Sequence, residues 1–199
     1  MRVDPGSFDA VYRSADDPWD FTTSSYELDK FDTTVASLGA QRYSRCFEPA
    51  CSIGVLTARL ATRADAVVAC DASPTAVARA RARLGHADHV DLVTGAVPEW
   101  WPQGSFDLIV LSELGYYWDL AGWSKVIRRC RASLRPGGEV IAVHWLGSSP
   151  DHILSGAVVH AELSAQLGVA DLHLERAGDP DARTMAGFVL DRWDDVRDE

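Results

Sequence analysis

Two acidic residues end two neighbouring apolar segments of this chain, and a tight turn of small residues follows the first of them. Glu48 begins the stretch Glu48-Pro-Ala-Cys-Ser-Ile-Gly54, and Asp71 closes the apolar run Ala66-Val-Val-Ala-Cys-Asp71. A strand, a small-residue turn, a helix and a second strand in this order place both acids at the carboxyl edge of a parallel sheet. At such an edge the turn can lie flat against a nucleotide-like ligand, while the second acid accepts hydrogen bonds from both ribose hydroxyls.

The turn lacks the G-x-G-x-x-G pattern of dinucleotide sites. Ala50 and Ser52 stand where glycines are common, and only Gly54 is kept. Fewer glycines leave less room for a pyrophosphate to approach the backbone. The turn therefore favours a cofactor with an uncharged link at this point, such as S-adenosylmethionine.

Composition limits the partners that the chain is expected to have. The 199 residues correspond to one domain, and 47% hydrophobic with 24% charged residues is ordinary for a globular protein in water. The net charge of −10 repels a phosphate backbone, so no nucleic-acid partner is expected. No apolar run approaches the roughly 18 residues of a membrane span, and the first residues lack an apolar signal core. A cytoplasmic location without a membrane partner is the resulting expectation.

The four cysteines are scattered and form no C-x-x-C pair. They are expected to be reduced core residues rather than metal ligands or disulfide partners. The histidine spacing does not suggest a metal site either, so no metal is predicted.

Apolar periodicity beyond residue 20 predicts alternating strands and helices. Residues 24–39 form one amphipathic helix that Ser24 or Ser25 can cap, whereas residues 1–20 are polar with scattered aromatic side chains. Strands are expected at about 44–48, 66–71, 89–94, 106–111 and 139–145, and helices at about 53–63, 74–85, 121–134 and 153–167. Two extended runs, 169–177 and 184–193, are joined by the turn signal Gly178-Asp-Pro-Asp181 and predict a hairpin. This alternation predicts an α/β fold with a mostly parallel sheet and helices on both faces.

These segments together resemble a known family. Glu48–Gly54, Asp71, Phe106-Asp-Leu-Ile-Val-Leu-Ser-Glu113 and Leu134-Arg-Pro-Gly-Gly138 are similar, in order and spacing, to class I S-adenosylmethionine-dependent methyltransferases over about residues 44–193. More narrowly, the turn resembles that of the nodulation protein S group, as do Asp17-Pro-Trp19, Ser25-Tyr-Glu-Leu-Asp-Lys30 and Ser112-Glu-Leu-Gly-Tyr-Tyr117. Members of that group N-methylate an amino sugar during lipochitooligosaccharide synthesis.

The resemblance implies a doubly wound, seven-stranded sheet of order 3-2-1-4-5-7-6 with an antiparallel last strand. Residues 1–40 would form a helical cap or lid, and residues 41–199 the S-adenosylmethionine-binding domain. The implied reaction is methylation of a small-molecule acceptor, an amino sugar or related amine, with S-adenosylhomocysteine as product. O-methylation of a hydroxyl and a non-catalytic cofactor-binding module stay open as alternatives. A nicotinamide dehydrogenase would need the missing glycines.

The resemblance also implies which residues hold the cofactor. Glu48 would hold the methionine amino group, Asp71 the ribose hydroxyls, and Ala72 would border the adenine; a strand-end acid and a helix cap are the plain alternatives for the two acids. The remaining cofactor contacts are expected from the turn, from the segment after residue 94, from a strand end and from the lid: Ala50, Gly54, Ala96, Val97, Ser112, Trp19 and Tyr26. Lys30 and Tyr26 are the two candidates to reach the cofactor carboxylate. Trp100 and Trp101 either form a wall of the adenine pocket or pack at the surface.

On the acceptor side, two residues are candidates for catalysis. Glu113 follows an apolar strand and can orient an amine or take its proton, and His144 lies near the end of the next strand. Structural roles are the alternative for both. The acceptor pocket is expected to include three aromatic side chains and one further histidine: Tyr116, Tyr117, Trp145 and His152.

Overall fold

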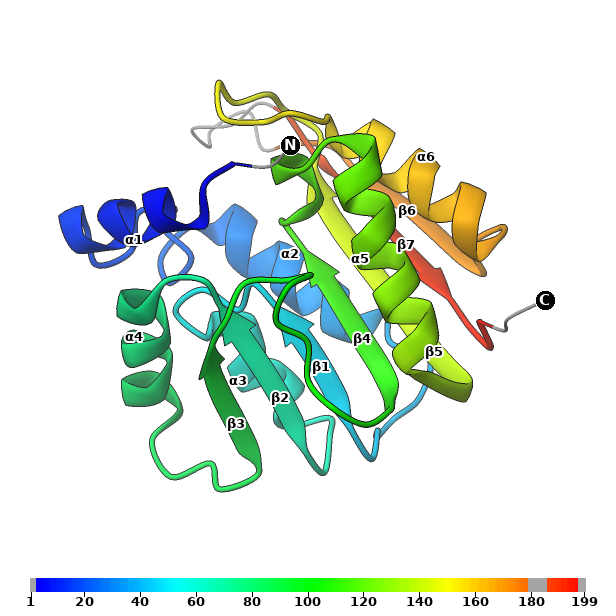
Figure 1. Ribbon diagram of the computed structural model, residues 1–199, viewed down its shortest axis with the longest axis horizontal. Helices are drawn as coiled ribbons and strands as arrows, with labels where there is room; N and C mark the ends of the chain where they lie inside the picture. Colours follow the sequence, from blue (N-terminus) through cyan, green and yellow to red (C-terminus); the bar gives the residue numbers. More distant parts are fainter. Residues whose placement is uncertain (1–2, 179–185, 197–199) are drawn as a thin grey trace.

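The computed structural model describes residues 3–178 and 186–196. Its centre is a seven-stranded sheet with helices on both sides (Figure 1). The strands are β1 (Cys46–Pro49), β2 (Val67–Asp71), β3 (Val90–Thr94), β4 (Phe106–Ser112), β5 (Leu134–Trp145), β6 (Leu172–Arg176) and β7 (Phe188–Trp193). The helices are α1 (Pro5–Ser14), α2 (Ser25–Ala36), α3 (Val55–Leu60), α4 (Pro74–Leu84), the 3₁₀ turn η1 (Gly115–Tyr117), α5 (Leu120–Ser133) and α6 (Gly156–Leu167).

The strand order is β3-β2-β1-β4-β5-β7-β6, which confirms the predicted doubly wound sheet. Strands β1 to β5 are parallel, whereas β7 runs antiparallel to both β5 and β6. The chain leaves the β3 edge and returns to the centre as β4, so the order reverses between β1 and β4. Such a reversal opens a crevice at the carboxyl ends of the strands, where ligands of this fold class bind.

Two apolar layers enclose the sheet. Helices α1, α2, α3 and α4 pack on one face, around side chains such as Phe31 and Leu60. Helices α5 and α6 cover the other face, with Trp123 and Ile127 fully buried there. Because both faces are covered, the central strands are apolar on both sides rather than alternating.

Short polar side chains begin the helices, as their composition predicts. Ser24, Ser73, Asp119 and Ser155 each accept a hydrogen bond from a backbone N–H in the first turn of α2, α4, α5 and α6 respectively. These caps satisfy donors that the helix itself cannot pair. Ser24, rather than Ser25, is the cap of α2.

Two segments differ from the sequence-based expectation. Helix α1 lies within the expected helical cap of residues 1–40, but apolar periodicity predicted no helix over residues 1–20, although Asp4 at the N-cap and Pro5 at the first position are a helix-start signal. Strand β5 begins at Leu134, directly after α5, because Leu134 pairs with Phe106 before the register shifts. The hairpin of β6 and β7 is present, while most of its predicted turn, residues 179–181, lies outside the described residues.

Candidate active site

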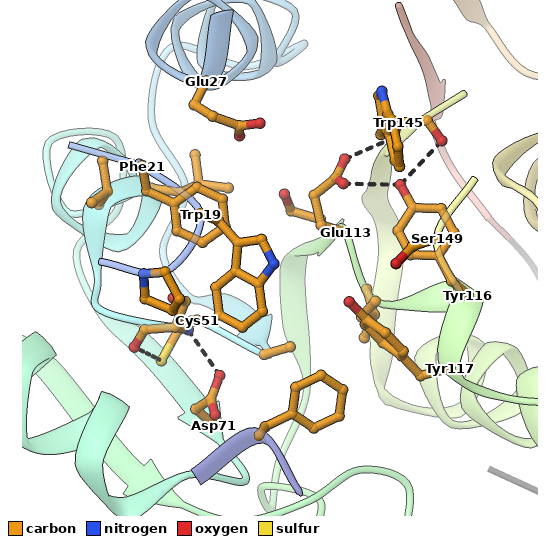
Figure 2. A pocket seen from close by; sticks show the side chains of 18 of the residues that line it. Trp19, Phe21, Glu27, Cys51, Asp71, Glu113, Tyr116, Tyr117, Trp145 and Ser149 are labelled. Carbon is orange, nitrogen blue, oxygen red and sulfur yellow. Dashed lines mark hydrogen bonds between the residues drawn. The ribbon is translucent and has the colours of Figure 1, made fainter. Parts of the chain in front are cut away.

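A cavity of about 900 Å³ lies over the carboxyl ends of β1, β2, β4 and β5, at the predicted reversal point. Figure 2 shows Asp71, Cys51 and Phe21 on one side of it and Glu113 with Tyr116 on the other, with the Trp19 ring between them. This volume is near the upper end of the roughly 300–1,000 Å³ typical of ligand pockets. It therefore has room for a nucleoside cofactor and an acceptor side by side.

The turn after β1 has the positive φ angles typical of glycine at three positions, although only one of the three residues is a glycine. Ala50, Ser52 and Gly54 all have positive φ angles, of 58°, 53° and 79°. Ala50 and Ser52 line the cavity, whereas Gly54 is turned toward α4, where a Cβ would lie 3.0 Å from the Cβ of Ala80. Gly54 is not among the lining residues, and its lack of a side chain lets the start of α3 pack close to α4.

Asp71 is buried at the end of β2 and faces this turn. Its Oδ2 accepts a hydrogen bond of 2.9 Å from the Ser52 amide, and its Oδ1 accepts one of 2.9 Å from the Ser73 amide. Burial raises the pKa of Asp71 to about 6, although these two amide bonds oppose the shift. Each oxygen keeps a further lone pair for a ligand, and Ala72 lines the cavity beside it.

Glu48 is a buried carboxyl group on the cavity wall without a full set of partners. Its Oε2 has no hydrogen-bond partner among the described residues. Burial, with a smaller contribution from the Asp71 charge, raises the pKa of Glu48 to about 8, and the Thr57 hydroxyl offsets only part of this. An orphaned buried acid of this kind suits a cationic ligand group, which would supply the missing partner.

Glu113 stands at the end of β4 with its carboxylate held from several sides. Its Oε1 accepts the Trp145 amide at 2.9 Å, and its Oε2 accepts the Tyr116 hydroxyl at 2.9 Å (Figure 2). The backbone of Glu113 has a φ of 55°, a left-handed conformation that turns the side chain toward the cavity. Ser112, the residue before it, also lines the cavity.

Lys30 completes this arrangement from beneath the cavity wall. Its side chain is 1% exposed, and its ammonium nitrogen lies 2.8 Å from Glu27 and 3.3 Å from Glu113. Burial alone would lower the pKa of Lys30, but the two carboxylates raise it overall, so the ion stays charged. Of the two residues predicted to reach the cofactor carboxylate, Tyr26 lines the cavity and Lys30 does not. Glu27 also lines the cavity, although it was not predicted to do so.

Aromatic side chains form the wall next to Glu113. The Tyr116 and His152 rings stack with centroids 4.1 Å apart and planes at 3°, and Tyr117 and Trp145 meet His152 edge-on. All four residues line the cavity, as the resemblance implied. Burial lowers the pKa of His152, so its ring favours the neutral form.

The part of the cavity next to the end of β3 is apolar. Ala96 and Val97 line it, in agreement with their predicted position. Trp100 and Trp101 do not, because both pack against Phe47 on the other side of the sheet edge, with the Trp101 ring 4.9 Å away. Of the two interpretations of this pair, the packed one is the one observed.

The N-terminal helices cover the cavity. Trp19 and Tyr26 line it as predicted, and α1 adds Phe8 and Tyr12, which the sequence analysis did not single out. Two polar contacts join α1 to the segments after β1 and β2, because Tyr12 donates to the Ser52 hydroxyl at 2.6 Å and Asp9 accepts from the Ser73 hydroxyl at 2.7 Å. The Asp4-Pro5 helix start, with aromatic residues at positions 8 and 12, was the signal available for this face.

His144 is not brought to the cavity. It is fully buried between β5 and α6, its Nε2 accepts the Gly115 amide at 3.1 Å, and its Nδ1 contacts His160 at 3.0 Å. Because both ring nitrogens are engaged away from the cavity, the predicted contact between His144 and an acceptor is wrong for this structure. Successive strand residues face opposite sides, which is why its neighbour Trp145 reaches the cavity and His144 does not.

The Asp and Glu side chains of the cavity wall have no Lys or Arg beside them in the lining of the described residues. Among the described residues, its lining includes no lysine or arginine and six acids: Asp20, Glu27, Glu48, Asp71, Glu113 and Asp151. Such a wall favours cationic and neutral ligands over phosphates or carboxylic acids.

The described residues contain no group of three or more His, Cys, Asp or Glu that could hold a metal ion. No helix in that part of the chain is long and apolar enough to cross a membrane.

Comparison with known proteins adds sequence similarity to this geometry. A family model described as a methyltransferase domain matches residues 47–138. Nodulation protein S of Rhizobium tropici is 28% identical over 177 residues, which are 84% of this chain and 72% of that protein. Nodulation protein S of Sinorhizobium fredii is 28% identical over 130 residues, and the match spans only 60% of its length.

Solved structures give the same fold. A crystal structure of a protein from Pseudomonas syringae, provisionally named a methyltransferase, is 37% identical with a TM-score of 0.71, over 86% of this chain and 99% of that one. The N-methyltransferase NodS from Bradyrhizobium japonicum WM9, solved with S-adenosyl-L-homocysteine, has a TM-score of 0.83 and 22% identity over 95% and 98% of the two chains.

Proposed function

Because this chain belongs to the methyltransferase family, we propose that it transfers the methyl group of S-adenosylmethionine to the nitrogen of a small amine of the amino-sugar type. The observation that carries the proposal is the cavity at the strand reversal. Its wall pairs two buried acids on the cofactor side with a held carboxylate and an aromatic wall on the acceptor side. The sheet order and the relatives of the nodulation protein S group are in agreement with it.

The cofactor would occupy the side nearest β1 and β2. Glu48, whose Oε2 lacks a partner among the described residues, would accept hydrogen bonds from the methionine amino group, and Asp71 would accept them from the ribose hydroxyls. The apolar segment with Ala96 and Val97 would border the adenine, and Trp19 and Tyr26 would cover the ligand from above. The fit is supported by the charge of the wall, because S-adenosylmethionine carries a sulfonium and an ammonium group. When bound, it supplies a methyl group already activated for transfer.

The acceptor would enter beside Glu113. A carboxylate that already accepts bonds from Tyr116 and the Trp145 amide, and that is paired with Lys30, is held in one orientation. It can hold an N–H group of the acceptor so that the nitrogen lone pair points at the methyl. The neighbouring rings attract a cationic amine, and water is excluded by the aromatic wall.

Deprotonation would need little help from the protein when the acceptor is an amine. An amine attacks once it is neutral, and the charge that develops on nitrogen would be stabilised by the acids of the wall. A hydroxyl acceptor needs a base as it reacts, and Glu113 is the candidate for that role. N-methylation is therefore favoured over O-methylation, because an amine acceptor needs no base as it reacts.

A methyl-transfer screen tests the proposal. The purified protein is incubated with S-adenosylmethionine carrying a labelled methyl group and with panels of amino sugars, other amines, hydroxyl compounds and acids. Labelled products are then detected by mass spectrometry. We expect transfer to amines and none to acids. Transfer only to hydroxyl compounds would identify the reaction as O-methylation. Cofactor binding without transfer to any compound of the panels would favour a non-catalytic binding module.

A further inference from the structure

Beneath the cavity, three buried residues and one exposed residue form a continuous hydrogen-bonded chain. His144 Nδ1 lies 3.0 Å from His160 Nε2, His160 Nδ1 lies 2.6 Å from Asp191 Oδ2, and Asp191 Oδ1 lies 2.6 Å from His173 Nδ1. His144, His160 and Asp191 are buried, whereas the His173 side chain is 60% exposed on β6. The chain thus runs from solvent, through β7 and α6, to β5 below the active site.

The directions of the hydrogen bonds from Gly115 through His144 and His160 to Asp191 are set at the inner end of this chain. The Gly115 amide can only donate, so the His144 Nε2 that accepts from it must carry no proton. Neutral His144 then has its proton on Nδ1 and donates to His160 Nε2. That nitrogen must also be unprotonated, so His160 donates from Nδ1 to Asp191. Only this proton arrangement satisfies the three hydrogen bonds between Gly115 and His144, between His144 and His160, and between His160 and Asp191.

The Gly115 amide that the chain holds begins η1, the turn that presents acceptor-side residues to the cavity. Tyr116 follows it and donates to Glu113, and the Tyr116 carbonyl accepts the amides of Ile153 and Leu154 from the loop with His152. Gly115 is itself in close contact with the histidine, since a Cβ there would lie 3.1 Å from His144 Nε2. The hydrogen bond from the Gly115 amide to His144 therefore fixes the start of η1, the turn next to Glu113 that contains Tyr116.

We propose that His144 and His160 are positioning residues that lock η1 only while both imidazoles are neutral, so that protonation of this pair releases the acceptor side of the cavity. The physical step is a tautomer change. A proton added at His160 Nε2 would face the His144 Nδ1–H. His144 must then move its own proton to Nε2, where it opposes the Gly115 amide. The bond to η1 is lost as a result. This inference concerns the chain's own residues and does not depend on the identity of the acceptor.

The charges around the pair support a neutral ground state. Burial is the main cause that keeps the pKa of His144 well below its usual range, and His160 when protonated, the Lys30 ammonium and His152 when protonated would each oppose a second positive charge there. Burial alone would raise the pKa of Asp191, but the bonds from His160 and His173 lower it overall, so it stays ionised. The ionisable groups that face the chain come from α2, the loop after β5, β7, β6 and the end of β4: Lys30, His152, Asp191, His173, Glu175 and Glu113.

His160→Gln offers a variant that imitates the neutral imidazole without titrating. Its amide oxygen can accept from His144 Nδ1–H, and its NH₂ group can donate to Asp191. Amide hydrogen exchange over residues 113–118 is measured in both proteins from pH 8 to pH 5, about the range in which histidine titrates, and is corrected for the intrinsic rate. His86→Gln, at an exposed histidine outside the chain, is the matched control.

We expect the wild type and His86→Gln to lose protection at Gly115 by about tenfold or more on acidification through the histidine range, while His160→Gln keeps it. Equal pH dependence in the wild type and a folded His160→Gln would overturn the proposal. The second measurement needs no variant. Nitrogen-15 spectra of the wild type at pH 8 should give an Nδ1-protonated His144, and an Nε2-protonated one would overturn the proposal even if His160→Gln does not fold.

Discussion

The buried ammonium nitrogen of Lys30 lies 3.3 Å from Oε1 of Glu113, the carboxylate that reaches the acceptor side of the cavity. The same nitrogen lies 2.8 Å from Glu27, so one cation neutralises two acids of the cavity wall. Without it, two like charges would face each other at the edge of an apolar pocket. Lys30 thereby sets the orientation of both carboxylates without touching a ligand.

Lys30→Met should lower the free energy of unfolding by about 2–4 kcal/mol, because it leaves two partly buried carboxylates without a counter-charge. Denaturant unfolding of the ligand-free protein measures this directly. The double variant Lys30→Met, Glu27→Gln should recover part of the loss, since one charge is removed with its partner. Equal stability of the wild type and Lys30→Met would mean that the ion pair has no net effect.

Glu113→Gln keeps the shape of the side chain and removes its charge. If Glu113 orients an amine, turnover should fall by about 10- to 100-fold, which is at or below the range of roughly 10²–10⁴-fold typical of a lost general base. The deficit should shrink as pH rises, because more acceptor is then neutral. Affinity for S-adenosylmethionine, measured by calorimetry, should hardly change. A larger, pH-independent fall would identify Glu113 as the base instead.

The raised pKa of Glu48 predicts that the free energy of unfolding falls as pH rises. Its pKa is about 8 in the folded protein and 4.5 for an ordinary glutamate, so the folded state holds the proton more tightly. The stability that this contributes is complete below pH 4.5 and is lost progressively as pH rises to 8. Glu48→Gln should therefore stabilise the ligand-free protein at pH 8 by about 2–4 kcal/mol relative to the wild type.

The same substitution should weaken cofactor binding, because the amide cannot pair with the methionine ammonium as a carboxylate does. Thermal unfolding from pH 5 to pH 8 and calorimetry with S-adenosylmethionine measure the two effects. Glu175→Gln, at an exposed acid of β6, is the control and should move neither. A pH-independent difference between Glu48→Gln and the wild type would show that the carboxyl does not titrate in this range.

Asp71→Asn should weaken the binding of S-adenosylhomocysteine by about 1–3 kcal/mol, through the loss of charge-assisted bonds to the ribose hydroxyls. Asparagine retains one oxygen acceptor for the turn amides, so the variant should fold. Asp91→Asn, at an exposed acid on the neighbouring strand β3, is the matched control. Unchanged affinity in folded Asp71→Asn, measured by calorimetry, would remove the ribose contact from the proposal.

The N-terminal cover should respond to the cofactor. Trp19 and Tyr26 line the cavity, and α1 is attached to the cofactor side by Tyr12 and Asp9. We expect hydrogen exchange over residues 8–30 to slow when S-adenosylhomocysteine is added, because a bound ligand gives these side chains a surface to pack on. Residues 121–133 of α5, on the opposite face of the sheet, serve as the internal reference. Equally fast exchange in both states over residues 8–30 would contradict a lid.

Local sequence patterns predicted most of the helices and strands and the positions of the two strand-end acids. The strand-end acids Glu48 and Asp71, with the small-residue turn between them, lie where alternating strands and helices predicted, because the carboxyl ends of parallel strands meet at one edge. The Asp4-Pro5 start of α1 was also local information, and the polar composition of residues 1–20 obscured it. Such features depend on contacts within a few residues, which the sequence by itself determines.

The acceptor side was decided by tertiary structure. Lys30 meets Glu113 across 83 positions of sequence. His160 of α6 contacts both His144 of β5 and Asp191 of β7, so three different elements meet there. Because both faces of the sheet are covered, the apolar pattern of β5 could not tell which of His144 and Trp145 faces the cavity. The close packing of α6 against that strand places His144 in the core, and the left-handed backbone at Glu113 turns its carboxylate into the pocket.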